Sequence, residues 1–356
     1  MTKKHPFPSG NDRRFWALIG LFIISIFIFK DQPHIAMWIG FLLAGYSAIA
    51  NDSIQTLGTF ISSNHKMKWW ILWLFLGGIM VAVFSYGWLQ GDMSFDRLDK
   101  IPEPTSFTHW QLFAPIILLI LTRLRMPVST TFLLLSVFSN GKTIAGMLNK
   151  TLIGYFVAFV SALIIWGIIA EAMKHKVFFK EQYNEKGWRV FQWIATGYLW
   201  STWLMQDTAN IVVFLPRDLS TNQFLAIIGA LFLGMGLLIY RRGGRIQEII
   251  TEKTDVVDVR SASIIDVVLG TLLMIFKEWN NLPMSTTWVF LGLLAGRETA
   301  LSRLSGHDKP YLRTLGLVTK DLAYASFGII ISIAIAYAAQ GDLHLGDITS
   351  TIFFWK

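Results

Sequence analysis

Long apolar segments separated by short polar stretches run along almost the whole chain. They cover residues 15–29, 35–62, 69–89, 110–122, 150–170, 188–205, 223–240, 262–276 and 316–339. A helix of about 20 apolar residues crosses the hydrocarbon core of a bilayer, and a backbone amide in lipid must find its partner within the helix. The pattern therefore predicts an all-α polytopic membrane protein.

Two further apolar stretches are too short to cross a bilayer, and the same motif precedes each of them. Arg-Met-Pro-Val-Ser-Thr-Thr occupies residues 125–131, and Asn-Leu-Pro-Met-Ser-Thr-Thr occupies residues 281–287. Proline favours the first position of a helix, where the next few N–H groups have no partner and the helix dipole is positive. We therefore expect two Pro-x-Ser-Thr-Thr half-helices that begin inside the membrane.

The start of each half-helix carries three hydroxyl side chains. They are Ser129, Thr130 and Thr131 in the first copy and Ser285, Thr286 and Thr287 in the second. Hydroxyls beside free N–H groups at a helix N-terminus form a cradle for an oxyanion. The alternative is structural, because Ser and Thr in membrane helices commonly bond back to carbonyls one turn earlier. The presence of two copies favours the binding interpretation.

A second pair of polar elements interrupts the apolar pattern. Residues 50–53 (Ala-Asn-Asp-Ser) lie within the segment 35–62, where they predict a broken helix, and residues 206–210 (Gln-Asp-Thr-Ala-Asn) interrupt the second half in the same way. An ionised carboxylate in mid-membrane costs several kcal/mol, so Asp52 and Asp207 are expected to face protein or water. The alternative is that these acids only cap half-helices, a position that Asp favours.

The two kinds of motif recur at one spacing. Gln206 follows Asn51 by 155 positions, and Pro283 follows Pro127 by 156. A shared offset indicates an internal duplication, the architecture in which transporters place a site on discontinuous helices between two inverted-topology repeats. The expected divisions are an N-terminal leader with the first span (1–30), repeat 1 (31–172), a linker (173–188), repeat 2 (189–340) and a C-terminal tail (341–356).

Composition agrees with this pattern and excludes several kinds of chemistry. Of 356 residues, 53% are hydrophobic and 15% are charged. The chain has no cysteine, which excludes disulfides, thiol catalysis and cysteine-ligated metals, and its seven histidines lack the spacing of a zinc enzyme. The sequence therefore predicts neither an enzyme nor a bound cofactor.

The charge pattern predicts the orientation in the membrane. The net charge of +8 reflects basic loops kept on the cytoplasmic side and not nucleic-acid binding. Four basic residues precede the first span and no cleavage site follows it, so we expect a cytoplasmic N-terminus and a plasma membrane location, the inner membrane of a bacterium. The acidic loop 90–109 then lies outside. Lys142 and Lys150 fit this scheme less well.

Together these motifs resemble the duplicated signature of the inorganic phosphate transporter (PiT) family, which includes sulfate permeases. The likeness runs from about residue 35 to about residue 340. In that family the Asn-Asp elements supply cation and substrate ligands and the Ser-Thr-Thr tips bind the anion. By matching position, the resemblance implies a cation-binding or coupling role for Asn51, Asp52, Gln206, Asp207 and Asn210. The chain resembles a divergent member of the family, because Phe132 and Trp288 stand where the family commonly has His.

The chemistry of these residues predicts ion-coupled transport. Asp52 and Asp207 repel an anion unless each is neutralised, because an uncompensated buried charge is very costly. We therefore expect Na⁺ at Asp52 and Asp207, or H⁺ in its place, as the coupling ion. The expected function is secondary active transport of inorganic phosphate by alternating access, and a homodimer would be ordinary for such a transporter. The alternatives are a sulfate permease of the same fold, a channel, and a transport-inactive membrane scaffold.

Overall fold

The structure is a computed structural model that describes residues 10–64, 66–124, 126, 128–174, 184–240, 259–304 and 311–341. All regular elements in these ranges are helices. They are α1 (Gly10–Phe29), α2 (Pro33–Ser63), α3 (Trp69–Leu89), α4 (His109–Arg123), α5 (Thr130–Leu135), the 3-10 helix η1 (Ser136–Phe138), α6 (Gly141–Lys174), α7 (Glu185–Asp207), α8 (Ala209–Val212), α9 (Thr221–Tyr240), α11 (Val259–Trp279), α12 (Thr286–Leu304) and α13 (Tyr311–Gln340). The predicted all-α class is confirmed.

The described helices have the length and surface of membrane helices. Five of them are long and apolar enough to cross a membrane: Trp69–Leu89, Gly141–Ile169, Thr221–Tyr240, Val259–Trp279 and Val318–Gln340. Large apolar side chains such as Phe156, Ile168 and Leu233 are more than half exposed. Such a surface is stable against lipid and not against water, so the chain is a membrane protein.

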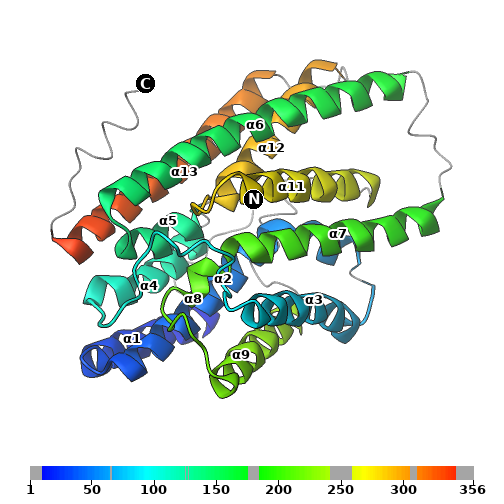
Figure 1. The fold of residues 1–356 in the computed structure, drawn as a ribbon. Coiled ribbons are helices and arrows are strands. Elements are labelled where there is room, and N and C mark those ends of the chain that lie inside the picture. The colour runs from blue at the N-terminus through cyan, green and yellow to red at the C-terminus, as the bar shows by residue number, and fades with distance from the viewer. Residues whose placement is uncertain are drawn as a thin grey trace.

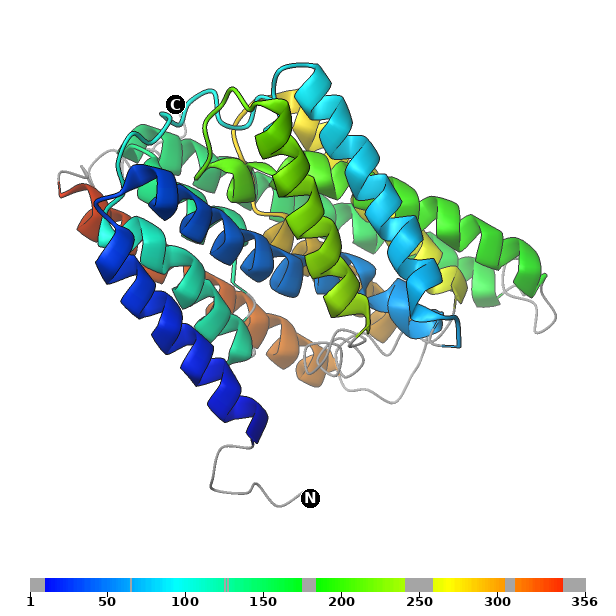
Figure 2. The ribbon, with the colours of Figure 1, turned by 90° about the horizontal axis from the view of Figure 1, so that it is seen from below.

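The outer helices enclose the long helix α2 and the two short helices α5 and α8. In Figure 1, α6, α12 and α13 lie along one side and α1, α3 and α9 along the other, with α2, α5 and α8 between them. The view from below in Figure 2 brings α1, α3 and α9 to the front. All residues of α5 and α8 are buried, so the polar residues on these short helices face protein and not lipid.

The predicted break at residues 50–53 is wrong, because α2 is helical from Pro33 to Ser63. Residues 50–53 include neither proline nor glycine. One turn earlier, the Ser47 hydroxyl donates within the same helix to Leu43 O at 2.8 Å. The second copy behaves as expected. There α7 ends at Asp207, α8 begins at Ala209, and the side chain of the intervening Thr208 bonds back to Leu204 O at 2.5 Å.

Two helical hairpins carry the Pro-x-Ser-Thr-Thr motifs into the bundle. The first consists of α4, α5 and η1, and we call residues 128–131 at its turn the first tip. The second consists of α11 and α12, and we call residues 284–287 at its turn the second tip. Gln111 at the start of α4 donates to Val137 O in η1 at 3.3 Å, so the first hairpin enters and leaves the bundle on the same side.

The hairpins point in opposite directions. Loop 90–108 marks one end of the bundle, and Thr143 at the start of α6, just after the first hairpin, donates to Lys100 O in that loop at 3.5 Å. The first hairpin therefore opens toward loop 90–108. The second hairpin instead turns its tip toward the loop, where Asn281 Nδ2 donates to Asp99 Oδ2 at 2.9 Å. Opposite entry is the arrangement that inverted repeats produce, while the duplication itself stays a prediction.

The second hairpin packs against α6 backbone to backbone. A Cβ atom added at Gly292 would collide with Tyr155 O, and one added at Gly296 would collide with Phe159 O. Both contacts advance in the same direction along the two helices, so α6 and α12 run parallel. Glycine is needed at both positions because only a residue without a Cβ permits such an approach.

Candidate functional site

The two tips touch each other inside the bundle. Thr131 Oγ1 of the first tip lies 3.3 Å from Met284 O of the second, and Thr287 Oγ1 of the second lies 3.5 Å from Val128 O of the first. The contacts are reciprocal, since each joins the last hydroxyl of one motif to the residue that follows the proline of the other. The six predicted cradle residues are therefore brought together, and all six are buried.

Asp207 joins the two tips at the point where α7 ends. Its Oδ2 accepts from Thr286 Oγ1 of the second tip at 2.6 Å. Its Oδ1 accepts from Thr131 Oγ1 of the first tip at 3.2 Å and from Asn210 Nδ2 at 2.9 Å. The side chain is 1% exposed. A single buried carboxylate thus bridges two hairpins that lie 156 positions apart in the sequence.

The hydrogen bonds around Asp207 cannot all form at once. Thr131 Oγ1 lies within bonding distance of both Asp207 Oδ1 and Met284 O, but a hydroxyl has one proton to donate. One of these two acceptors is therefore left for another donor or for a cation. The site has spare acceptor capacity where the two tips meet.

Asn51 holds the first tip from α2. Its Nδ2 donates to Thr130 Oγ1 at 3.1 Å and lies 3.3 Å from Val128 O. Its Oδ1 accepts from Thr122 Oγ1 of α4 at 3.1 Å. Asn51 therefore contacts the first tip, while its cation-binding or coupling role stays a prediction. Asp52 lies in α2, but its side chain is outside the described residues.

The serines of the two tips act as helix N-caps. Ser129 Oγ accepts from Phe132 N at 3.1 Å, and Ser285 Oγ accepts from Trp288 N at 3.3 Å. The N–H of Ser285 donates to Thr151 Oγ1 of α6 at 3.1 Å. Capping occupies one N–H at each tip. The serine hydroxyls keep their own protons for donation to a ligand.

Two amide oxygens beside Asp207 are buried without a hydrogen-bond partner among the described residues. They are Gln206 Oε1 and Asn210 Oδ1. Gln206 is anchored by its other amide atom, since Nε2 donates to Leu273 O of α11 at 2.6 Å. Carboxylate and amide oxygens are ligands suited to hard cations. Residues 206–210 therefore carry the oxygen ligands that the predicted cation site requires.

The fold around this site is similar to that of a solved structure. A solved structure titled "The sodium-dependent phosphate transporter" is similar to the chain with a TM-score of 0.58, at 13% sequence identity, over 90% of this chain and 98% of that one. The two share a fold. No family model and no curated protein matches the chain.

This likeness confirms part of the resemblance drawn from the motifs. The chain shares its fold with that solved transporter. At 13% identity the likeness speaks for the fold alone, so the roles of the tip hydroxyls and of residues 51, 52, 206, 207 and 210 stay predictions.

Two buried cations that the sequence did not point to lie beside the second tip of this transporter fold. Arg97 of loop 90–108 and Lys150 of α6 are 1% and 3% exposed. Arg97 Nη1 donates to Asn280 O at 2.7 Å and to Leu282 O at 3.2 Å. Lys150 Nζ donates to the same two oxygens, at 2.9 and 2.8 Å. Lys150 fitted the predicted loop charges poorly because it is not a loop residue.

The guanidinium of Arg97 keeps its charge at this position. Burial lowers the pKa of Arg97 to about 10, and the carboxylates of Asp207, Asp96 and Glu278 oppose that shift. Asp207, the residue that bridges the tips, is one of these carboxylates. At neutral pH the second tip therefore has a permanent cation near it.

Asp266 is a second buried carboxyl that the sequence analysis missed. It lies in α11, is 1% exposed, and accepts from Thr196 Oγ1 of α7 at 2.5 Å. Among the described residues it forms no hydrogen bond to either tip. The signal that could have found it was an acidic residue inside the apolar segment 262–276.

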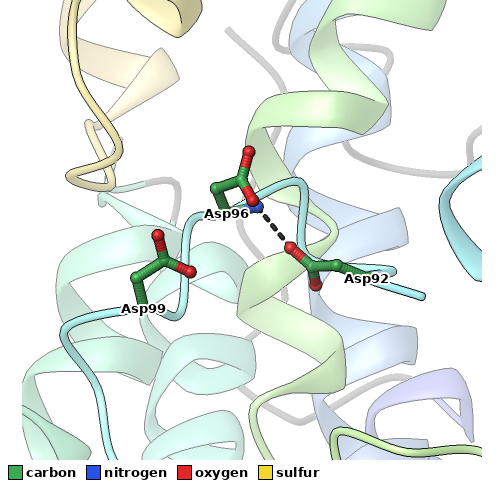
Figure 3. A group of neighbouring side chains, drawn as sticks. All are labelled: Asp92, Asp96 and Asp99. Carbon is green, nitrogen blue, oxygen red and sulfur yellow. Dashed lines mark hydrogen bonds between the residues drawn. The ribbon is translucent and has the colours of Figure 1, made fainter. Parts of the chain in front are cut away.

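Three carboxylates in loop 90–108 form a separate acidic group (Figure 3). Ligand oxygens of Asp92, Asp96 and Asp99 lie within 4.8 Å of one another. Asp92 already accepts from the backbone N–H groups of Ser94 and Asp96, at 2.7 and 2.5 Å. With Asp99 bonded to Asn281, these carboxylates shape the loop and attach it to the second hairpin.

Proposed function

We propose that the protein is a secondary active transporter of an inorganic oxyanion, coupled to Na⁺ or H⁺. The observation that carries the proposal is that Asp207 bonds to both tips, in the interior of a bundle with the fold of a solved transporter. Ionisable residues buried in a membrane domain are most often functional, because burying them is costly. The site also lies where helices are discontinuous, as in other secondary transporters.

The anion binds at the tips. The N-terminus of α12 contributes the positive end of a 19-residue helix. Hydroxyls of Ser129, Thr130, Ser285 and Thr287 contribute donors, and those of Thr131 and Thr286 join them once the Asp207 carboxylate no longer engages them. Phosphate is the first candidate because the solved structure with this fold is titled as a phosphate transporter, and sulfate is the second.

The cation binds next to the anion. Asp207 offers a carboxylate, and Gln206 and Asn210 offer buried amide oxygens without partners among the described residues. With no neutralising ion, Asp207 would repel the anion and would hold the hydroxyls that the anion needs. Binding of Na⁺ or H⁺ at Asp207 removes both obstacles, which couples the two solutes. Asp52 is the proposed counterpart in the first copy.

Transport proceeds by alternating access between two repeats. Hairpins that enter from opposite ends and touch at their tips can open the site to either side when one repeat rocks against the other. The parallel backbone contact of α6 with α12 makes the second hairpin move with α6 as one body.

Uptake of radiolabelled phosphate into proteoliposomes tests the proposal, with Na⁺ and pH gradients imposed separately. Asp207→Asn should abolish gradient-driven uptake, because the amide cannot carry the charge that the coupling ion neutralises. The matched control is Asp218→Asn, since Asp218 is exposed in the loop before α9. Full gradient-driven uptake by Asp207→Asn would contradict the coupling role.

A membrane scaffold without transport is the second candidate. The observation that favours it is that Asp207, Asn51 and the serine caps already satisfy much of each tip without a ligand. Equilibrium binding decides between the two, since a scaffold would bind neither phosphate nor sulfate at any Na⁺ concentration.

A further inference from the structure

We propose that Arg97 and Lys150 form a two-cation binding site for the oxyanion, at the turn that leads into the second tip. The proposal rests on the proposed function for the class of ligand, inorganic phosphate or sulfate. It adds a site that the tips and the Asn-Asp elements do not include.

The first argument is charge. Both side chains are buried, and both donate to the carbonyl oxygens of Asn280 and Leu282. Carbonyl groups contribute partial charges only, and no carboxylate of the described residues lies within 4.0 Å of either cation. Two neighbouring buried basic groups repel each other when both are protonated, and the carboxylates of Asp207, Asp96 and Glu278 offset the cost of desolvating Arg97 only in part. A doubly charged anion would remove that imbalance.

The second argument is the orientation of the arginine. Nη1 makes both of its bonds to the turn, while Nε and Nη2 are fully buried without a partner among the described residues. Nε–H and Nη2–H form one edge of the planar guanidinium, and this edge binds two oxygens of a carboxylate or phosphate in parallel. Unpaired buried donors are rare because each costs free energy. The free edge is therefore a recognition surface.

Stabilisation of the turn explains only part of this arrangement. Residues 280–282 follow the C-terminus of α11, where a cation is favourable. One cation would satisfy the two carbonyl oxygens, and two are present. The unpaired edge of Arg97 contributes nothing to holding the turn. Anion binding accounts for both the second charge and the free edge.

The position suits an anion on its way to the tips. Arg97 belongs to loop 90–108, and Lys150 is followed by Thr151, which bonds the N–H of Ser285 in the second tip. An anion held by Arg97 and Lys150 therefore lies between the loop and the second tip. Since loop 90–108 is expected outside, this is the outer approach to the site.

The test is equilibrium binding of radiolabelled phosphate to purified protein, with sulfate as the competing anion. Arg97→Lys keeps the charge and removes the parallel donor edge, and Lys150→Met keeps the length and removes the charge. Each should raise the Kd for phosphate about 10-fold or more, the effect of losing charge-assisted hydrogen bonds. Lys100→Gln in the same loop and Lys142→Met in the same helix are matched controls. Both lysines are exposed, and their substitutions should change the Kd less than about twofold.

Thermal unfolding separates binding from a structural role. In the binding role, phosphate raises the unfolding temperature of the unchanged protein and no longer does so in Arg97→Lys or Lys150→Met. If both variants unfold at a lower temperature but keep the Kd of the unchanged protein, the inference is overturned while the proposed function stands. If the unchanged protein binds neither phosphate nor sulfate, the proposed function is wrong, and this inference, which rests on it, is wrong as well.

Discussion

The two tips share a motif but lie in different electrostatic surroundings. The first tip is held from α2 by the neutral amide of Asn51, which in turn accepts from the Thr122 hydroxyl of α4, and its bond to the Asp207 carboxylate is the longer one at 3.2 Å. The second tip forms the shorter bond to the Asp207 carboxylate, and the turn before it holds the cations Arg97 and Lys150. Charge thus gathers at one tip, although the sequences of the two tips are nearly the same.

This difference separates two tasks. The repeated motif builds a frame of two hairpins whose tips exchange equivalent hydrogen bonds. Residues outside the repeated motifs, such as Arg97 in a loop and Lys150 in α6, supply the charge that a multivalent anion needs in the proposed site. We therefore expect substitutions at the second tip to reduce phosphate binding and uptake more than the matched substitutions at the first tip.

The largest expected effect is on the packing of the second hairpin. Gly292→Val would force a side chain into Tyr155 O, and overpacking against a backbone that cannot retreat should cost about 3 kcal/mol or more. The position that matches it in the first hairpin, Ser136, already holds a buried side chain. The yield of monodisperse protein and its unfolding temperature measure the effect.

A control for Gly292→Val lies in α9. A Cβ at Gly234 would meet no atom within 4 Å, so Gly234→Val should leave yield and unfolding temperature nearly unchanged. Equal losses from the two substitutions would mean that valine in a membrane helix is itself harmful and that the contact of α6 with α12 is not special.

The next effect compares one hydroxyl from each tip. Thr286 donates to a carboxylate at 2.6 Å, whereas Thr130 accepts from the Asn51 amide at 3.1 Å. Hydrogen bonds to charged groups contribute about 1.5–3 kcal/mol and neutral ones about 1 kcal/mol. Thr286→Val should therefore reduce phosphate uptake at least about 10-fold, and Thr130→Val about fivefold. Initial uptake rates per reconstituted protein measure both, and a larger loss in Thr130→Val would refute the ranking.

A third comparison concerns the threonines that support the tips from neighbouring helices. Thr151→Val leaves the buried N–H of Ser285 without its acceptor, which costs about 1–3 kcal/mol. Thr122→Val removes a donor to Asn51 Oδ1, and a buried carbonyl oxygen with a missing donor is tolerated better than an N–H without an acceptor, so this loss should cost about 1 kcal/mol. The unfolding temperature should fall further in Thr151→Val. The same fall in both would mean that the tips are equally supported.

The sequence predicted the frame of the site well. The proline before each tip, the hydroxyls after it and the matched spacing are local or periodic features that can be seen in the sequence. The expected helix start at proline is wrong for the second copy, because α12 begins at Thr286 and not at Pro283, and with 19 residues it is longer than the expected half-helix. Asp207 could be singled out because an ionisable residue inside an apolar membrane segment is costly to bury and is therefore usually functional. These signals assigned the two tips and Asp207 to one site from the sequence alone.

The sequence could not predict contacts that join distant segments. Arg97 lies in a polar loop where arginine is ordinary, and only the fold buries it against residues 280–282. The break expected at residues 50–53 also failed, because a polar run without proline or glycine can stay helical when its side chains find tertiary partners, as Asn51 does. Burial and pairing are set by the whole fold and not by the local pattern.

The smallest effect concerns the serine caps, and it isolates affinity from stability. Ser129→Ala and Ser285→Ala each remove an N-cap bond, to Phe132 N and to Trp288 N, and each should lower stability by about 1 kcal/mol. Stability should therefore not distinguish the tips. Substrate affinity should fall more than stability in both, and more in Ser285→Ala, because that hydroxyl lies on the tip beside Arg97 and Lys150. Phosphate Kd values and unfolding temperatures from the same preparations measure this. Equal losses of affinity would show that the two tips contribute alike and that the charge gathered at the second tip does not act on the anion.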